Sequence, residues 1–293
     1  MNTAAEMRGP ELHPSLSPQD FSRLAAVLNG RLGIKLPESK RSMLEMRLRP
    51  RIRALGFADH DAYCRHLFRG DTLTAEMQHL VDAVTTNKTD FFREPEHFAV
   101  LRDQLVPEVV KARRAAGTPL LKIWSAAAST GAEAYTIAMV LEDMQRNARS
   151  FRYGILGTDV SAAVIEQAET AVYPMEMLIP VPAAMKDRYL LSSIYGGSGA
   201  VGRIVPELRR HTRFSLLNLM DKQYAVDRDV DVIFLRNVLI YFERPDQEAV
   251  IGRLLGHLRP GGALILGHAE AAIGTGMGLE EIASGVFRKD AGR

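Results

Sequence analysis

Apolar residues recur at helical spacing through the first part of the chain. They form three stripes: Phe21, Leu24, Ala25 and Leu28, then Leu44, Leu48, Ile52 and Leu55, then Tyr63, Leu67 and Phe68. Residues three or four apart share one face of a helix, and no strand-like alternation interrupts the region. Ser17 or Asp20 is placed to cap the first helix. We therefore predict a small all-helical domain over residues 19–85, preceded by a disordered lead over residues 1–18.

The pattern changes after a polar stretch near residues 85–89, where short apolar runs begin to alternate with helical segments. The runs predicted as strands are 120–126, 153–158, 212–217, 230–235, 263–267 and 286–287. The main predicted helices are 131–146, 161–170 and 245–258. This alternation is typical of a parallel sheet covered on both faces. We predict a linker over residues 86–95 and an α/β domain over residues 96–293.

A glycine-rich stretch between residues 195 and 202 interrupts this alternation. It lies between two short extended runs, which is typical of a β-hairpin. We predict that the hairpin is an insertion into the α/β domain at about residues 187–211.

Composition narrows the class of protein. The chain has 293 residues, of which 46% are hydrophobic and 25% charged, as in a soluble globular protein. Its net charge of +2 provides no overall field for nucleic acid. The single Cys64 allows neither an internal disulfide nor a cysteine metal cluster. With no signal-peptide core or membrane-length apolar segment, we expect a cytoplasmic monomer that inserts into no membrane and binds neither metal nor nucleic acid.

Candidate chemistry begins at the turn that follows the first predicted strand. Residues 125–133 read Ser-Ala-Ala-Ala-Ser-Thr-Gly-Ala-Glu, so small residues connect a strand to a helix. Such turns hold the cofactor in doubly wound α/β domains, because the helix amides point outward and small side chains let a ligand approach. Asp159 ends the next strand, where a carboxylate accepts hydrogen bonds from ribose hydroxyls. Because the turn lacks the Gly-x-Gly-x-x-Gly pattern, the sequence favours S-adenosylmethionine (SAM) over NAD.

Five separated motifs together resemble one family. They are residues 87–94 (Asn-Lys-Thr-Asp-Phe-Phe-Arg-Glu), residues 125–133, Asp159, Asn218-Leu219, and residues 234–242 (Phe-Leu-Arg-Asn-Val-Leu-Ile-Tyr-Phe). In order and spacing they resemble CheR, the chemotaxis receptor glutamate O-methyltransferase family, and the similarity runs from about Phe21 to the C-terminus. The resemblance implies a Rossmann-like, SAM-dependent methyltransferase domain with a small β-hairpin insertion, preceded by a small all-helical domain.

The resemblance also implies the residues that bind the cofactor. Glu133 is expected to contact SAM, although Thr130-x-x-Glu133 also matches a capping box, a purely structural motif. Asp159 is expected to bind the ribose, although it could simply cap the next helix. Asn218 and Leu219 are expected to contact the adenosine part.

Further site residues follow from the linker and from the strand 230–235. Arg236 and Asn237 lie at the carboxyl end of that strand, where open α/β sheets bind ligands. The resemblance adds three cofactor contacts from the linker, Asn87, Thr89 and Arg93.

Two residues are expected to act in catalysis. Tyr241 resembles the active-site tyrosine of the family, which positions the acceptor carboxylate, although it could be a core aromatic residue. Arg93 is expected to help orient the reactants as well as to bind the cofactor. Gly-Ala-Glu-Ala at residues 131–134 and Gly-His-Ala-Glu at residues 267–270 depart from the family's Gly-Glu-Glu-Pro and Gly-His-Ser-Glu. We expect structural roles for His268 and Glu270.

A basic run lies in the predicted helical domain. Residues 40–53 include Lys40, Arg41, Arg47, Arg49, Arg51 and Arg53. A solvated helix face is the common explanation for such a run, but the family uses this domain to contact receptors. Arg47, Arg51 and Arg53 are therefore expected to bind an acidic receptor helix. Pro50 inside the run predicts a kink or two short helices.

The expected partner is the cytoplasmic region of a methyl-accepting chemoreceptor. In some family members the hairpin insertion also binds the receptor's C-terminal peptide as an added strand. Two alternatives stay open from the sequence: a methyltransferase with another acceptor, and a non-catalytic SAM sensor or scaffold. Nucleic-acid binding by the basic run is a weaker third, because the net charge is close to zero.

Overall fold

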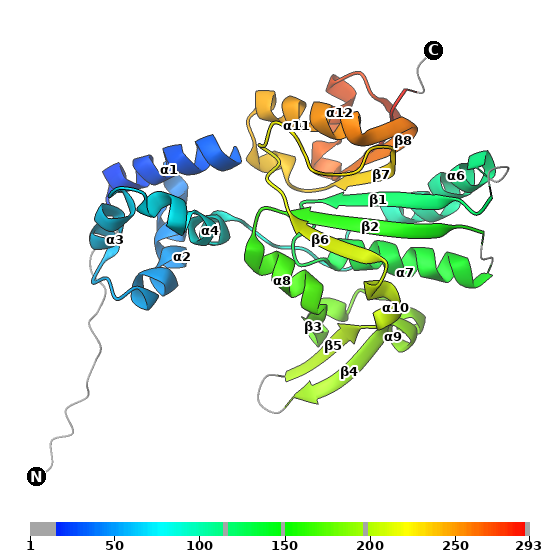
Figure 1. The fold of residues 1–293 in the computed structure, drawn as a ribbon, viewed down its shortest axis with the longest axis horizontal. Coiled ribbons are helices and arrows are strands. Elements are labelled where there is room, and N and C mark those ends of the chain that lie inside the picture. Colours follow the sequence, from blue (N-terminus) through cyan, green and yellow to red (C-terminus); the bar gives the residue numbers. More distant parts are fainter. Residues whose placement is uncertain (1–15, 114–116, 148–149, 196–198, 291–293) are drawn as a thin grey trace, which may run out of the picture. The chain divides into compact units, whose positions relative to one another are not determined.

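A computed structural model describes residues 16–113, 117–147, 150–195 and 199–290. Most of the lead predicted over residues 1–18 lies outside these residues. The chain divides after Thr86 into two compact units (Figure 1). No helix in the described ranges is long and apolar enough to cross a membrane.

The first unit is helical. Its elements are α1 (Pro18–Leu32), the 3-10 helix η1 (Glu38–Lys40), α2 (Arg41–Ala54), α3 (His60–Leu67) and α4 (Thr72–Val84). The three predicted apolar stripes supply its core, for example Leu24, Leu44 and Leu67, which are fully buried. Ser17 caps α1 as predicted, since its side chain accepts a hydrogen bond from the Asp20 amide.

Helix α2 is continuous through Pro50, so the predicted alternative of two short helices is wrong. Proline removes the amide that would bond the carbonyl four residues earlier, which belongs to Met46. Pro50 is exposed and Met46 is 61% exposed, so water can reach that side of the helix. The helix continues because the lost bond faces solvent rather than the core.

The second unit is built on a mixed sheet of seven described strands. They are β1 (Leu120–Ala126), β2 (Arg152–Asp159), β6 (Thr212–Leu216), β7 (Val230–Leu235), β8 (Leu258–Leu266), β9 (Glu280–Ala283) and β10 (Val286–Arg288). Their order is β6-β2-β1-β7-β8-β10-β9. The five strands from β6 to β8 are parallel as predicted, whereas β10 is antiparallel to β8 and to β9. The sheet is therefore parallel except at its β8 end.

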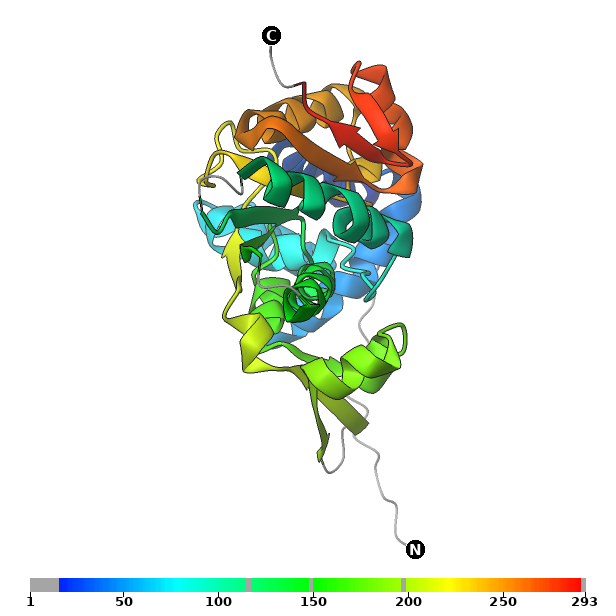
Figure 2. The same ribbon diagram turned by 90° about the vertical axis from the view of Figure 1, so that its right-hand side faces the viewer.

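Helices pack along this sheet (Figures 1 and 2). They are α5 (Pro95–Val100), the π-helical turn η2 (Leu101–Leu105), α6 (Val106–Arg113), α7 (Ala132–Asn147), α8 (Ala162–Thr170), α10 (Pro206–Arg209), α11 (Arg244–His257) and α12 (Ala271–Gly276), with 3-10 turns η5 (Leu239–Tyr241) and η6 (His268–Glu270). One hydrophobic cluster joins α7 to the sheet and to α5, η2 and α6. The start of α7 is consequently almost fully buried, which fixes the turn that precedes it.

A small second sheet holds the predicted hairpin. In it β4 (Leu190–Tyr195) pairs with β5 (Gly199–Ile204), and β5 also pairs with β3 (Val172–Pro174). The 3-10 turn η4 (Met175–Leu178) and α9 (Ala183–Tyr189) lie between β3 and β4. The hairpin tip at residues 196–198 lies outside the described residues. The insertion is thus larger than a hairpin, because β3 adds a third strand.

The parallel strands bring their carboxyl ends to one edge of the large sheet. Ala126 pairs with Thr158 and with Leu235, and Leu235 pairs with Leu266. Segments that follow β1, β2, β7 and β8 therefore meet at this edge, where ligands bind in open α/β sheets.

Candidate functional site

A tight turn joins β1 to α7. Its backbone is left-handed at Ala127 (φ 57°), Ser129 (φ 51°) and Gly131 (φ 85°). A side chain at Gly131 would place its Cβ 2.9 Å from Ala168 Cβ, so glycine is required there by space as well as by conformation. Left-handed non-glycine residues are uncommon and cluster at ligand sites. The turn therefore has a strained backbone conformation beside the edge where the parallel strands end.

Asp159 connects this turn to the next one. Its Oδ2 accepts a hydrogen bond from the Ser129 amide at 2.9 Å, and its Oδ1 accepts one from the Ser161 amide at 3.0 Å. The residue is 8% exposed. These bonds hold the carboxylate between the β1–α7 turn and the start of α8.

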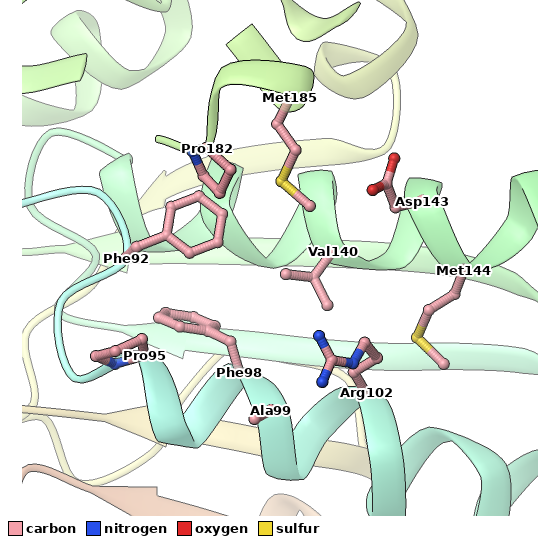
Figure 3. Close-up of a pocket in the computed structure, with 10 residues that line it drawn as sticks. All are labelled: Phe92, Pro95, Phe98, Ala99, Arg102, Val140, Asp143, Met144, Pro182 and Met185. Carbon is pink, nitrogen blue, oxygen red and sulfur yellow. The ribbon is translucent and has the colours of Figure 1, made fainter. Parts of the chain in front are cut away.

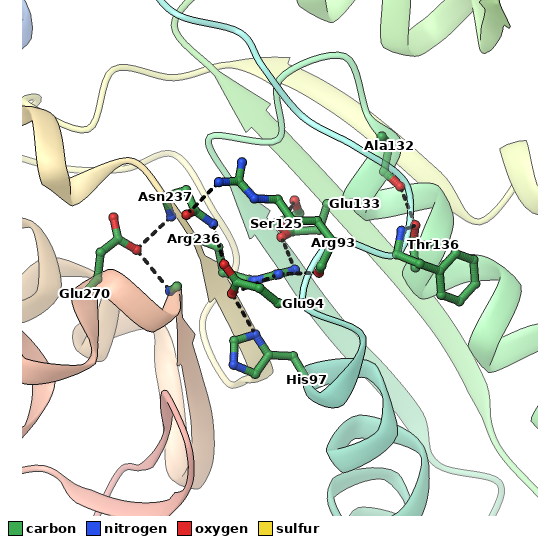
Figure 4. Close-up of polar contacts among 12 residues, drawn as sticks. Arg93, Glu94, His97, Ser125, Ala132, Glu133, Thr136, Arg236, Asn237 and Glu270 are labelled. Atoms are coloured by element: carbon green, nitrogen blue, oxygen red, sulfur yellow. Dashed lines mark hydrogen bonds and ion pairs between the residues drawn. The ribbon is translucent and has the colours of Figure 1, made fainter. Parts of the chain in front are cut away.

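Arg236 lies at the centre of a buried polar network (Figure 4). Its Nη1 donates to Glu133 Oε2 at 3.1 Å, and its Nη2 lies 3.1 Å from Glu94 Oε2 and donates to the Arg93 carbonyl. Ser125 Oγ donates to the other Glu133 oxygen at 2.7 Å. The Arg236 side chain is only 3% exposed, so both carboxylates neutralise a buried cation.

The capping box at Thr130 and Glu133 is not formed. The Thr130 hydroxyl makes no hydrogen bond within the described residues. Helix α7 begins at Ala132, so Thr130 and Glu133 do not occupy the N-cap and third helical positions that a capping box requires. Glu133 is directed instead toward Ser125 and Arg236. When both carboxylates are ionised, these two acids and the Arg236 guanidinium sum to one negative charge.

Burial and partners set the protonation of these two carboxylates. Burial raises the pKa of Glu133 above its ordinary value, although Arg236 and the Ser125 hydroxyl oppose the shift. Burial alone would raise the pKa of Glu94 as well. The hydrogen bond from Asn237 and the charge of Arg236 outweigh it, so the pKa of Glu94 is lowered. Glu94 therefore stays ionised to a lower pH than Glu133 does.

Asn237 links this network to the linker and to the segment after β8. Its Oδ1 accepts from Arg93 Nη2 at 2.9 Å, and its Nδ2 donates to Glu94 Oε1 at 3.1 Å. Its backbone is left-handed, with φ 60°. The fully buried Glu270 holds that backbone, accepting from the amides of Asn237 (2.7 Å), Leu239 (2.7 Å) and Gly267 (3.0 Å).

Tyr241 ends the 3-10 turn that Glu270 supports. The turn runs over Leu239–Tyr241, and the Tyr241 amide bonds the Val238 carbonyl at 3.1 Å. Its side chain is partly exposed, unlike those of the buried core aromatics. Glu270 thus positions the segments that carry both Asn237 and Tyr241.

The linker residues are tied to the β1–α7 turn. The Asn87 carbonyl accepts from Ser129 Oγ at 2.9 Å, and the Phe92 amide donates to Thr136 Oγ1 at 3.2 Å. Phe91 is buried and packs edge-on against Tyr173, with ring centroids 5.0 Å apart. Thr89, between these anchors, is half-buried.

Asn218 and Leu219 follow β6 in a loop fixed by its backbone. Asn218 Oδ1 accepts from the Met220 amide at 3.0 Å. The Leu219 carbonyl accepts from the Tyr224 hydroxyl at 2.7 Å and from Arg253 Nη2 at 2.9 Å. Leu219 itself is 7% exposed, so its side chain is buried as well.

The arginines of the basic run in the helical unit differ in their contacts. Arg47 Nη1 donates to the carbonyls at the end of α4, the shortest bond being 2.8 Å to Thr85. Arg51 forms a two-pronged ion pair with the buried Glu76, at 2.6 and 2.9 Å. Arg53 is exposed, and no side-chain partner is described for it. Two of the three predicted receptor-binding arginines thus make contacts inside their own unit.

Glu94 and Ser125 are site residues that the sequence patterns do not predict. Glu94 lies beside Arg93 in the motif at residues 87–94, and Ser125 is the last but one residue of β1. Their position beside assigned residues was the available signal. Glu94 pairs with Arg236 and Ser125 donates to Glu133, and these contacts form only in the folded chain.

An apolar cavity of about 320 Å³ lies between α5, α7 and the start of α9 (Figure 3). Phe92, Phe98, Val140, Met144 and Met185 form most of its wall. None of the residues predicted to bind SAM lines it. It is therefore separate from the predicted cofactor site, although Phe92 precedes Arg93 in the chain.

The fold and the site define a class. A sheet edge with a strained small-residue turn after β1 and a carboxylate at the end of β2 is suited to a nucleoside cofactor. A network of net charge −1 at the same edge suits the cationic SAM. These features define a SAM-dependent methyltransferase.

Comparison with known proteins identifies the family. The family model described as "CheR methyltransferase, SAM binding domain" matches residues 87–283, and "CheR methyltransferase, all-alpha domain" matches residues 19–85. The chemotaxis protein methyltransferase of Salmonella typhimurium is 38% identical over 256 residues, covering 87% of this chain and 85% of the relative. That of Borreliella burgdorferi is 31% identical over 280 residues, covering 95% and 97%. The chain therefore belongs to the CheR methyltransferase family.

Proposed function

We propose that the protein transfers the methyl group of SAM to glutamate side chains in the cytoplasmic region of chemoreceptors, producing glutamate methyl esters. The observation that carries this proposal is the buried Arg236 network, which leaves one negative charge at the sheet edge. The names of the relatives support a role in chemotaxis. We also propose that it acts in the cytoplasm as a monomer that binds no nucleic acid.

The carboxylates of the site bind the cofactor in this proposal. Asp159, which ends β2 beside the β1–α7 turn, accepts hydrogen bonds from the ribose hydroxyls. Glu133 attracts the cationic methionine end of SAM. Arg236 holds Glu133 in position, because its guanidinium is already surrounded by Glu133, Glu94 and the Arg93 carbonyl.

The remaining cofactor residues come from the linker and from two loops. Arg93 is half-exposed and binds the methionine carboxylate in this proposal, held in place by the bonds that it donates through Nη2 to Asn237 and through Nη1 to the Lys88 carbonyl. Asn218 and Leu219 contact the adenosine part from the loop after β6. Asn87 and Thr89 lie over the cofactor, anchored through the bond between Ser129 and the Asn87 carbonyl.

The reaction requires no general base from the protein and depends mainly on how the two reactants are aligned. A glutamate with an ordinary pKa of about 4.3 is ionised in roughly 500 of 501 molecules at pH 7, so the nucleophile needs no general base. The attacking carboxylate and the sulfonium become two neutral products, so a site shielded from water favours the transition state. Alignment of the two reactants supplies up to about 7–11 kcal/mol in favourable cases. Tyr241, partly exposed at the end of η5, positions the acceptor carboxylate.

The receptor is recognised by the helical unit and by the small sheet. Arg53 contacts the acidic receptor helix directly, while Arg47 and Arg51 stabilise the helices that present it through their bonds to α4 and Glu76. In the small sheet β4 pairs on one side with β5 and forms an edge, to which a receptor C-terminal peptide adds as a further strand.

A labelling experiment separates this proposal from its alternatives. The protein is incubated with methyl-labelled SAM and membranes that contain chemoreceptors of its own organism. The proposal predicts label on receptor bands that mild base releases as methanol, because esters are base-labile. Base-stable label would indicate another acceptor atom, and SAM binding without label would indicate a non-catalytic sensor or scaffold.

A further inference from the structure

Two buried acceptor atoms face each other beside the Arg236 network. They are Glu94 Oε2 and His97 Nδ1, which lie 3.4 Å apart (Figure 4). Glu94 Oε2 is in the ion pair with Arg236, at 3.1 Å, whereas His97 is fully buried and its Nδ1 takes part in no hydrogen bond within the described residues. Buried polar atoms are nearly always partnered, so this nitrogen requires an explanation.

The orientation of the His97 ring directs a lone pair at Glu94. The ring nitrogen Nε2 lies 3.0 Å from the Ser284 carbonyl, which only accepts hydrogen bonds, so Nε2 carries the proton. In the neutral ring the other nitrogen, Nδ1, is then an acceptor. A lone pair directed at a carboxylate oxygen is repulsive unless a proton or a metal ion lies between them.

A second imidazole completes the cluster. The rings of His97 and His268 meet edge to face with centroids 5.0 Å apart, and one ligand atom from each of Glu94, His97 and His268 lies within 4.8 Å of the others. The His268 side chain is 44% exposed and lies 2.7 Å from Glu96. The cluster therefore has a buried half made by Glu94 and His97 and a half open to water.

We propose that Glu94, His97 and His268 bind a divalent transition-metal ion, with Zn²⁺ the best match. Two imidazole nitrogens and one carboxylate oxygen form a common three-ligand set for zinc, and the solvent side provides room for water as the fourth ligand. The bond from His97 to the Ser284 carbonyl is the outer contact that usually orients a metal-binding imidazole. This site goes beyond the methyl transfer proposed above.

The site is coupled to cofactor binding through Glu94. The same carboxylate contacts Arg236 and accepts from Asn237. A bound divalent cation adds positive charge next to the network that attracts the cationic SAM, so metal binding weakens SAM binding. By linkage, SAM weakens metal binding by the same factor.

Calorimetry with ZnCl₂ and the full-length apoprotein tests the site. The wild-type protein is expected to bind one Zn²⁺, and His268→Ala is expected to weaken this affinity more than tenfold. His268 is suited to substitution because its side chain is largely exposed, so the fold should persist. His211→Ala, a partly exposed histidine of the same unit outside the cluster, should bind Zn²⁺ as the wild type does.

Two further readouts decide between a built site and surface binding. Cobalt(II) added to the wild-type protein should produce visible absorption bands of nitrogen- and oxygen-bound cobalt, and His268→Ala should not produce them. Zinc should weaken SAM binding severalfold in the wild type and not in His268→Ala. Absence of Zn²⁺ binding, or equal binding by His268→Ala and the wild type, overturns the metal site, and a proton then bridges Glu94 and His97. An unchanged SAM affinity in saturating zinc overturns the coupling.

Discussion

At the scale of single residues, the protein neutralises Arg236 with its own carboxylates rather than leaving it for a ligand. Glu133 and Glu94 lie 3.1 Å from its two terminal nitrogens. Placing a cation between two acids fixes both acids in position, and breaking such a buried group is costly because a charge is left without a partner. In the proposed function, the acids are therefore already in place when the positively charged SAM binds.

This arrangement predicts how SAM binding depends on pH. Burial raises the pKa of Glu133, so this carboxyl takes up a proton at a higher pH than an ordinary glutamate does. Protonation removes the negative charge that attracts SAM, so SAM affinity should fall as pH is lowered through that raised pKa. Calorimetry at a series of pH values measures the effect. Glu133→Gln should bind SAM more weakly and lose this part of the pH dependence; equal profiles for both proteins would contradict the assignment.

Asp159 provides a second residue-scale prediction. Asp159→Ala removes a charged acceptor of ribose hydroxyls, and hydrogen bonds to charged groups contribute about 1.5–3 kcal/mol. SAM affinity should therefore fall by about tenfold or more in calorimetry. Asp227→Ala, which removes a mostly exposed carboxylate of the same unit, is the control and should bind normally. Unchanged affinity in the folded Asp159→Ala protein would exclude the ribose contact.

Local sequence predicts some of these residues and misses others for a physical reason. Asp159 and Arg236 each lie at or just beyond the end of an apolar run, so the strand pattern alone places them at the sheet edge. Glu94 and Glu270 act on Asn237, which is 143 and 33 residues away along the chain. Contacts of that separation exist only after folding and produce no local pattern.

At the scale of elements, helix α2 shows how a charged run is divided between stability and surface. Arg51 pairs with the buried Glu76, which also accepts from the Tyr63 hydroxyl at 3.3 Å. Arg53, two residues later, is exposed. The two arginines belong to one sequence pattern, but only one of them is free to meet a partner protein.

These two arginines should therefore respond differently to substitution. Arg51→Ala leaves Glu76 without its cation and should cost about 2 kcal/mol of stability, because the pair is partly buried. Arg53→Glu should leave stability nearly unchanged but slow receptor methylation at saturating SAM. Thermal unfolding and initial methylation rates measure the two effects. A normal methylation rate for Arg53→Glu would assign this residue to a plain solvated surface.

The elements also show where hydrophobic patterning stops being informative. The strands β1 and β7 are buried apolar runs and were predicted with their observed limits. Strand β9 is exposed or half-buried at each of its residues, so it lacks an apolar signal. Its antiparallel pairing with β10 depends on a neighbour brought close by the turn at Gly285, whose φ is 69°.

At the scale of the whole molecule, the chain combines a helical unit with a methyltransferase unit. The change from helical periodicity to alternating strands and helices revealed this combination in the sequence. The family models cover both units, and the relatives match along most of the chain. In the proposed function, the second unit binds SAM and transfers its methyl group, while the first unit and the small sheet contact the receptor.

The central claim is that this chain esterifies glutamate side chains of a chemoreceptor. Tandem mass spectrometry of a receptor cytoplasmic fragment, incubated with the protein and SAM, tests it most directly. The claim predicts added methyl groups on glutamate side chains, removed by mild base and strongly reduced at low SAM concentration when the protein carries Asp159→Ala. Methyl groups on lysine or arginine nitrogens, or an unmodified receptor in the presence of SAM-bound protein, would contradict it.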